Sequence, residues 1–375
     1  MNLTIKRVTT KKEGRLFTEF PNKMYRDVEA FVPALSLDEN NVFDQKKNPV
    51  HEYCESVRFL AYRNDHIVGR IAGIINHKIN DSMEDKQVRF SRLDMIDEIE
   101  ITKALIKTVE TWGLEKGCKT IIGPIGFTDL DRQGMLIEGF DQLNMFITIY
   151  NHEYYHKHLE KLGFVKDAVW VEKKLFSPKE IPDKVARGAR IARERFGMEL
   201  VKIKRKKDVY KHIYKAFDMY NVAFSELYGF YPITRKVMDY YIDQMMLLVS
   251  LDYLWFIYDK EGMMAGFGIV MPSLAKANKK SNGKLLPFGA LRLLRAVKHY
   301  DVIDLYFIAV DPKHQGKGLI AMMWEDGLKT MLKKGVKYAE TGPELENNLK
   351  MLNQWKNFDY IDHKRRACFK KSISN

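Results

Sequence analysis

The feature that most constrains the fold is an internal repeat: the second half of this 375-residue chain follows the pattern of the first. FLAYRNDHIVGRIAGII (59–75) and WFIYDKEGMMAGFGIV (255–270) each read as two strands joined by a tight turn. A helical run of apolar residues precedes EKGCKTIIGP and again KKGVKYAETGP, and NHEYYHKHLEKLGF is matched by NNLKMLNQWKNFDY. Because the matches share one order, we predict two copies of one α/β unit, each built as β, α, β-hairpin, β, α, β, α, β.

The offset between matched residues locates two insertions. It is 197 between Gly69 and Gly266, rises to 218 between Gly117 and Gly335, and returns to 196 at the last match. The rise places about 21 extra residues between the third strand and the long helix of the second half, and the fall places about 22 between residues 124 and 151. With a boundary near Ser177, the predicted domains are 1–178 and 179–375.

Composition excludes several classes of protein. Cys54, Cys118 and Cys368 are far apart, which argues against a disulfide framework or a cysteine-rich zinc site. The amino terminus lacks an apolar stretch after its basic residues, and the most apolar segment, 245–258, is too short to span a bilayer. We therefore expect a cytoplasmic protein with no membrane association, and the sequence predicts no oligomeric state.

The net charge of +13 is concentrated in two segments. Residues 179–207 carry 11 basic and 4 acidic residues, and residues 276–298 carry 7 basic and no acidic residues, so each contributes +7. Such segments suit an anionic ligand or RNA, but a solvated surface explains them equally well. Nucleic acid is therefore a less favoured partner than a small molecule.

The most specific local signal is DLYFIAVDPKHQGKGLIAMMWEDGLKTMLKKG, residues 304–335. An apolar strand ends at Val310, a loop with two glycines follows, and an amphipathic helix begins at about Leu319. Glycines let the backbone approach a ligand closely, and a helix amino terminus offers N–H groups and a positive dipole end to an anion. Lys313 and Lys317 add charge, so we predict a pyrophosphate cradle. Neither a Walker A loop nor a GxGxxG fingerprint is present.

This stretch resembles the GNAT superfamily of acyl-CoA-dependent N-acyltransferases. QGKG (315–318) matches the family's Q/R-x-x-G-x-G/A loop at its first and fourth positions, although Ile320 stands where the family has Gly or Ala. The resemblance covers nearly the whole chain and implies an α/β (α+β) protein of two tandem GNAT-like folds, each a mixed sheet flanked by helices. It implies acetyl-CoA or another acyl-CoA as co-substrate and no metal. The residues expected to contact it are Ile308, Ala309, Val310, Gln315, Gly316, Lys317, Gly318, Leu319, Ile320, and Asn347 or Asn348.

The catalytic candidates are Asp304, Glu340 and Tyr306. In histone-acetylating members of the family a glutamate occupies the place of Asp304, which makes it the first candidate for the base, although a solvated residue at a strand start is an equal alternative. Glu340 on the neighbouring predicted strand is the second candidate, with a salt bridge as its alternative. Many members have a tyrosine acid where Trp355 stands here, and Tyr306 is a candidate substitute. Strand alternation predicts that Asp304, Tyr306 and Ile308 share one face.

The two halves are not equivalent. Where the second half has KHQGKG, the first has SRLDMIDEIEI, whose acidic residues would repel a pyrophosphate. The first half is therefore predicted to keep the fold with a degenerate cofactor loop. The predicted function is acyl transfer to an amine on a small-molecule acceptor of anionic character. The alternatives are a non-catalytic acyl-CoA or nucleic-acid binding module, and an aminoacyl-tRNA-dependent peptidyltransferase-like enzyme.

Overall fold

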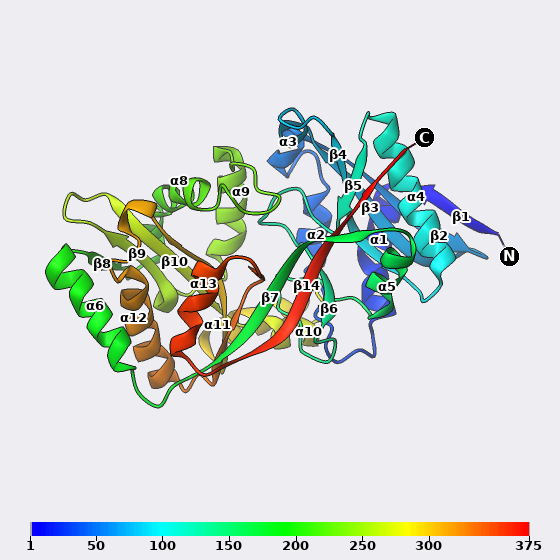
Figure 1. Ribbon diagram of the computed structural model, residues 1–375. Helices are drawn as coiled ribbons and strands as arrows, with labels where there is room; N and C mark the ends of the chain where they lie inside the picture. Colours follow the sequence, from blue (N-terminus) through cyan, green and yellow to red (C-terminus); the bar gives the residue numbers. More distant parts are fainter. Residues whose placement is uncertain (1, 375) are drawn as a thin grey trace. The chain divides into compact units, whose positions relative to one another are not determined.

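The computed structural model describes residues 2–374 and divides into two compact units (Figure 1). Unit 1 comprises Met1–Val171, Ala275–Ala290 and His363–Asn375, and unit 2 comprises Glu172–Leu274 and Leu291–Asp362. No helix among the described residues is long and apolar enough to cross a membrane. Each unit is a mixed sheet flanked by helices, as the repeat predicts.

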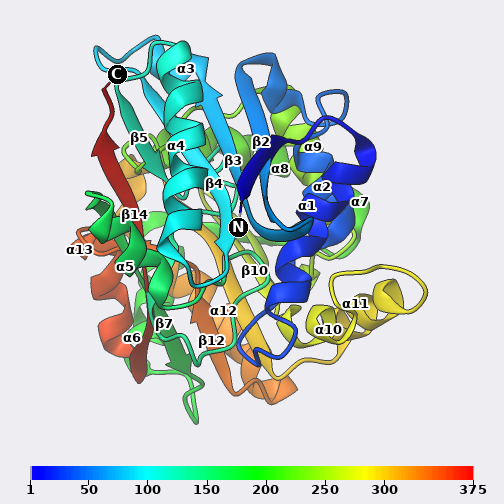
Figure 2. The same ribbon diagram turned by 90° about the vertical axis from the view of Figure 1, so that its right-hand side faces the viewer.

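The sheet of unit 1 has the order β1-β2-β3-β4-β5-β14, with the first part of β7 (Val165–Phe176) beside β14; β4 and β5 run parallel, and the other pairs from β1 to β14 are antiparallel. Its strands are β1 (Leu3–Arg7), β2 (Cys54–Arg63), β3 (His66–Asn76), β4 (Gln87–Met95), β5 (Thr120–Gly123) and most of β14 (Tyr360–Ser372), with β6 (Met135–Glu138) paired to β14. Its helices are α1 (Lys11–Met24), α2 (Ser36–Val42), α3 (His77–Asn80), α4 (Ile99–Glu115), α5 (Tyr154–Lys161) and α10 (Ala275–Lys280). Figure 2 shows α4 lying over β3 and β4.

The sheet of unit 2 has the order β7-β12-β11-β10-β9-β8, and only β11 and β12 run parallel. Its strands are the last part of β7 (Val165–Phe176), β8 (Glu199–Lys202), β9 (Leu254–Tyr258), β10 (Met264–Pro272), β11 (Val302–Val310) and β12 (Tyr338–Thr341), with the short β13 (Glu344–Leu345) paired to β7. Its helices are α6 (Asp183–Phe196), α7 (Lys206–Val209), α8 (Ile213–Ala223), α9 (Arg235–Met246), most of α11 (Gly289–Lys298), α12 (Leu319–Lys334) and α13 (Leu349–Leu352).

Each unit has its own apolar core, and the long helices contribute to it as their periodicity predicts. In α4 the buried side chains include Ile101, Leu105 and Val109, which recur every four residues and pack into the core of unit 1. In α12 the buried Trp324 and Leu328 do the same in unit 2. The internal repeat is thus a repeat of structure as well as of sequence.

The division of the chain differs from the predicted boundary at residue 178, because each half gives part of its last strand to the other unit. The end of β7 belongs to unit 2, where Leu175 is the register partner of Ala339 in β12. The end of β14 belongs to unit 1, where Phe369 is the register partner of Gly123 in β5. A sequence repeat shows which residues of the two halves match each other. It does not show which neighbouring strand each of those residues pairs with, so the sequence could not reveal this exchange.

Candidate functional site

In unit 2 the two parallel strands β11 and β12 separate just before the segment Ile308 to Val310, which is predicted to contact the cofactor. Their register runs from Val302 opposite Tyr338 to Leu305 opposite Thr341, and the Gly342 N–H donates to the Leu305 carbonyl at 3.1 Å. Beyond Leu305 the register with β12 ends within the described residues, while β11 continues to Val310 beside β10. The main chain of Ile308 to Val310 therefore lies on the part of β11 that faces this separation.

A β-bulge changes which side chains of β11 share a face. The register with β10 shifts between Ile269 and Val270, which leaves Tyr306 as the extra residue. Ile308 consequently packs with Leu305 against the helical core of unit 2. The prediction that Asp304, Tyr306 and Ile308 share one face is therefore wrong for Ile308, since simple alternation takes no account of a bulge.

The predicted cradle is a tight turn between β11 and α12. A short 3₁₀ helix (Pro312–His314) follows β11, and Gly316 and Gly318 then adopt positive φ angles of 76° and 85°. Gly318 is the residue before α12, and no side chain caps the helix there. A Cβ on Gly318 would lie 2.5 Å from the Gly188 carbonyl oxygen of α6, whereas a Cβ on Gly316 would have open space around it. The turn is thus held against α6 at one glycine and open to solvent at the other.

The remaining loop residues surround this helix end. Lys313, Gln315 and Gly316 are exposed, and Lys317 and Ile320 are half-buried. Leu319 is 2% exposed and packs in the core of unit 2. The first N–H groups of a helix have no partner within it and carry the positive end of its dipole. The turn therefore has the charge and the donors that a pyrophosphate requires.

The two predicted carboxylates are both buried and stand side by side. Asp304 is 0% exposed and Glu340 is 6% exposed, and they are register partners on β11 and β12. Glu172 of β7 is also buried, with a carboxylate oxygen within 4.8 Å of one from Glu340. The alternative of a solvated Asp304 is therefore wrong. Burial, and then the charge of Glu340, raise the pKa of the neighbouring Tyr338 to about 12, so this phenol stays protonated at neutral pH.

A further carboxylate, which sequence reasoning missed, lies just beyond the separation of the strands. Glu344 follows Gly342 and Pro343 and accepts hydrogen bonds from the indole N–H of Trp355, at 3.0 Å to Oε1 and 2.7 Å to Oε2. Burial raises the pKa of Glu344 to about 7, although the Trp355 hydrogen bond opposes the shift. Trp355, which is 0% exposed, stands where the family has its tyrosine. The indole N–H of a buried Trp355 needs a hydrogen-bond acceptor, and this need was the one signal in the sequence that pointed to a carboxylate such as Glu344.

The two predicted asparagines lie at the start of α13. The Asn348 side chain caps this helix by accepting from the Met351 N–H at 3.3 Å, and the Asn347 carbonyl accepts from the Leu349 N–H at 3.0 Å. The Asn347 side chain is exposed. Asn348 thus has a structural role, and Asn347 is the one whose side chain faces solvent.

In unit 1 the corresponding strand end is occupied by the protein itself. Met95 pairs with Gly69 as Val310 pairs with Gly266. The Met95 N–H donates to the Tyr155 hydroxyl at 3.1 Å, and its carbonyl accepts from the Tyr154 hydroxyl at 2.6 Å. The helix that follows begins after Glu98, whose carboxylate pairs with Arg63. The Met95 N–H and carbonyl, which could otherwise pair with a ligand, are therefore already hydrogen-bonded to the Tyr155 and Tyr154 hydroxyls.

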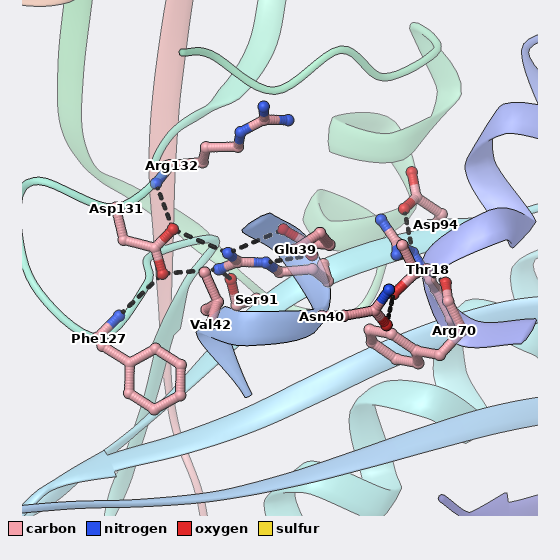
Figure 3. A network of polar contacts seen from close by, with 12 residues as sticks. Thr18, Glu39, Asn40, Val42, Arg70, Ser91, Asp94, Phe127, Asp131 and Arg132 are labelled. Carbon is pink, nitrogen blue, oxygen red and sulfur yellow. Dashed lines mark hydrogen bonds and ion pairs between the residues drawn. The ribbon is translucent and has the colours of Figure 1, made fainter. Parts of the chain in front are cut away.

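A buried ion network fills the bulge of β4 in unit 1 (Figure 3). Arg92, which has a φ of 50°, donates to Glu39 at 3.0 Å and to Asp131 at 2.8 Å and 2.9 Å. Burial opposes ionisation of Glu39, but Arg92 lowers its pKa to about 2. Asp131 also accepts from the main-chain N–H groups of Phe127 and Arg132. These charges satisfy one another, which favours a structural role.

An aromatic cluster covers β11 on the side of α8. Phe307 lies 5.8 Å from Tyr220 and 6.4 Å from Phe224, measured between ring centroids, and Tyr306 lies 6.4 Å from Phe307. Phe230 lies 5.9 Å from Tyr220. Aromatic side chains are therefore packed beside the bulge.

Comparison with known proteins finds a family match that falls mostly on unit 2. Residues 216–358, from α8 to just before β14, match the model of the acetyltransferase (GNAT) family. Protein YghO of Escherichia coli (strain K12) is 25% identical over 380 residues, covering 97% of this chain and 94% of YghO. The bacterial ceramide synthase of Caulobacter vibrioides is 24% identical over 301 residues, covering 79% of this chain and 77% of that protein.

Two solved structures have a similar fold. A tandem GNAT protein from the clavulanic acid biosynthesis pathway superposes with a TM-score of 0.57 at 12% identity, and each chain is covered completely. The GCN5-related glucosamine N-acetyltransferase region of a fungal multi-domain β-N-acetylglucosaminidase superposes with a TM-score of 0.58 at 12% identity, covering 99% of this chain and 38% of that one. At such identities the likeness shows the fold alone.

Proposed function

We propose that this chain is an N-acyltransferase of the GNAT family and that its unit 2 transfers an acyl group from acyl-CoA to an amine. The observation that carries the proposal is the turn before α12, where an open glycine and an uncapped helix end follow the part of β11 that pairs with β10 but not with β12. The α12 amino terminus would hold the pyrophosphate, and the main chain of Ile308 to Val310 would pair with the pantetheine arm.

Acyl transfer requires the loss of a proton from the attacking amine and the gain of one by the departing thiolate. The amine nitrogen forms the new bond to the thioester carbon, and the C–S bond breaks. We assign the acceptance of the amine proton to Glu344, because a carboxyl with a pKa of about 7 is partly ionised at neutral pH. Asp304 and Glu340 remain candidates, but both lie in the paired part of the strands, before the separation.

For the acceptor, a long-chain amine fits better than the anionic small molecule predicted from the sequence. The side of β11 that faces α8 carries an aromatic cluster centred on Phe307 and Tyr220. A ceramide is the amide of a long-chain amino alcohol, and the Caulobacter ceramide synthase is similar to most of this chain. A panel of amines that differ only in chain length tests this choice. If turnover does not rise with the chain length of the amine, the long-chain acceptor is rejected and a small-molecule amine is the substrate class.

The direct test is release of CoA thiol from acetyl-CoA and longer acyl-CoAs, with Gly316→Asp and Gly316→Asn as a matched pair. Both side chains tolerate the positive φ of this position and enter open space, but only aspartate adds a negative charge beside the expected pyrophosphate. We expect roughly ten-fold weaker acyl-CoA binding for Gly316→Asp and near-normal binding for Gly316→Asn. Equal affinities for the two variants would contradict the cradle.

Two other functions give different results in the same assays. Acyl-CoA binding without turnover on any amine would indicate a binding module. Stimulation by aminoacyl-tRNA, with no use of acyl-CoA, would indicate the peptidyltransferase-like alternative. Binding of tRNA through many phosphates also weakens steeply as salt is added. Turnover of a long-chain amine should depend on salt much less.

A further inference from the structure

One surface segment stands out among the described residues. It comprises residues 284–298, the loop before α11 and the helix itself, and we call it the apolar-basic segment. Four large apolar side chains protrude from it: Leu286 (81% exposed), Phe288 (61%), Leu291 (64%) and Leu294 (39%). Exposed apolar side chains scattered singly need no explanation, but such a group on one continuous segment of chain is typical of an interaction surface.

The helix presents these apolar side chains together with cations. Leu293 is 2% exposed and lies on the inner side of α11. On the outer side Leu291 is one turn from Arg295, and Leu294 is one turn from Lys298, and all four are exposed. Leu291 and Leu294 therefore each have a positive charge beside them.

The charge of the surrounding chain has a single sign. Residues 276–298 contain seven basic residues and no acidic residue. The segment leading to α11 is also fixed in place within unit 1, since the Asn278 side chain donates to the Pro33 carbonyl at 2.6 Å. The partner of this surface must therefore be both apolar and negatively charged.

We propose that the apolar-basic segment docks on an anionic lipid surface. In this arrangement the four apolar side chains enter the boundary between headgroups and acyl chains, and the arginines and lysines lie at the lipid phosphates. RNA would satisfy the cations but leave the leucines in water. The proposal stands independently of the acyl-transfer activity.

The test is co-sedimentation of the full chain with phosphatidylcholine vesicles with and without phosphatidylglycerol. Binding is expected only when phosphatidylglycerol is present, and it should weaken as salt is added. The double variant Phe288→Ser with Leu291→Ser should lose at least about ten-fold in affinity. The double variant Arg295→Gln with Lys298→Gln should lose roughly five-fold for each cation removed.

The matched control is Met263→Ser, which removes a side chain of similar exposure (66%) from the turn between β9 and β10. It should bind vesicles as the unchanged protein does. The proposal is overturned if the chain does not bind the anionic vesicles, if the Phe288 and Leu291 variant binds as well as the control, or if RNA alone is bound. Thiol release with a water-soluble amine, measured on the same variants, separates these outcomes from a failure of the acyltransferase proposal.

Discussion

At the scale of single residues, Glu344 is the group whose ionisation matters near neutral pH. Its pKa is raised from 4.5 to about 7 by burial, with the indole of Trp355 as its hydrogen-bond donor. If this carboxylate accepts the proton of the amine, activity rises as pH increases through about 7. The Glu344→Gln variant should lose this inflection and most of the activity. The exposed Glu346→Gln should keep both, and an unchanged pH profile in Glu344→Gln would return the role to Asp304 or Glu340.

The same shift has a consequence for stability. Because the folded-state pKa of Glu344 lies above its value of 4.5 in the unfolded chain, its contribution to stability is present in full below about pH 4.5 and is lost as pH rises through about 7. Relative to Glu344→Gln, the unchanged protein should therefore lose stability between these values. Thermal unfolding of both proteins across this range measures the difference. A difference in melting temperature that stays constant with pH would show that the carboxyl does not titrate there.

At the scale of elements, the turn into α12 depends on two glycines for different reasons. Both have positive φ angles, so alanine at either position costs about 1 kcal/mol of backbone strain. At Gly318 the added Cβ would also meet the Gly188 carbonyl of α6 at 2.5 Å. Gly318→Ala should therefore lower the free energy of unfolding clearly more than Gly316→Ala, as measured by denaturant titration. Equal losses of unfolding free energy in the two variants would mean that α6 shifts away from the added Cβ without a cost.

These elements also show what the sequence could predict and what it could not. The glycine turn and the apolar stripe of α12, including Trp324, were predictable because they depend on local spacing. The bulge at Tyr306 was not, since it depends on the register with β10, and it moves Ile308 to the other face. Glu344 was missed because its raised pKa arises from burial, which no motif shows.

At the scale of the whole molecule, the exchange of the last strands makes each unit depend on the other half of the sequence. Phe369, near the end of the chain, is 0% exposed in the core of unit 1, and Leu175, near its middle, is 2% exposed in the core of unit 2. Truncating a buried large apolar side chain to alanine costs on the order of 2–5 kcal/mol.

We therefore expect reciprocal effects in hydrogen exchange measured by mass spectrometry. Phe369→Ala should reduce protection first in β5 of unit 1, and Leu175→Ala should reduce it first in β12 of unit 2. Each variant serves as the control for the other. Loss of protection confined to the half that carries the substitution would contradict the exchange.

The exchanged strand also sets an order of events during synthesis. A ribosome makes residues 1–171 before residues 363–372, yet the sheet of unit 1 lacks the strand beside β5 until these later residues have been added. The N-terminal unit must therefore wait, with an open strand edge, while the whole of the other unit is translated. Each unit is therefore assembled from residues that lie far apart in the order of synthesis, although the two units repeat one pattern.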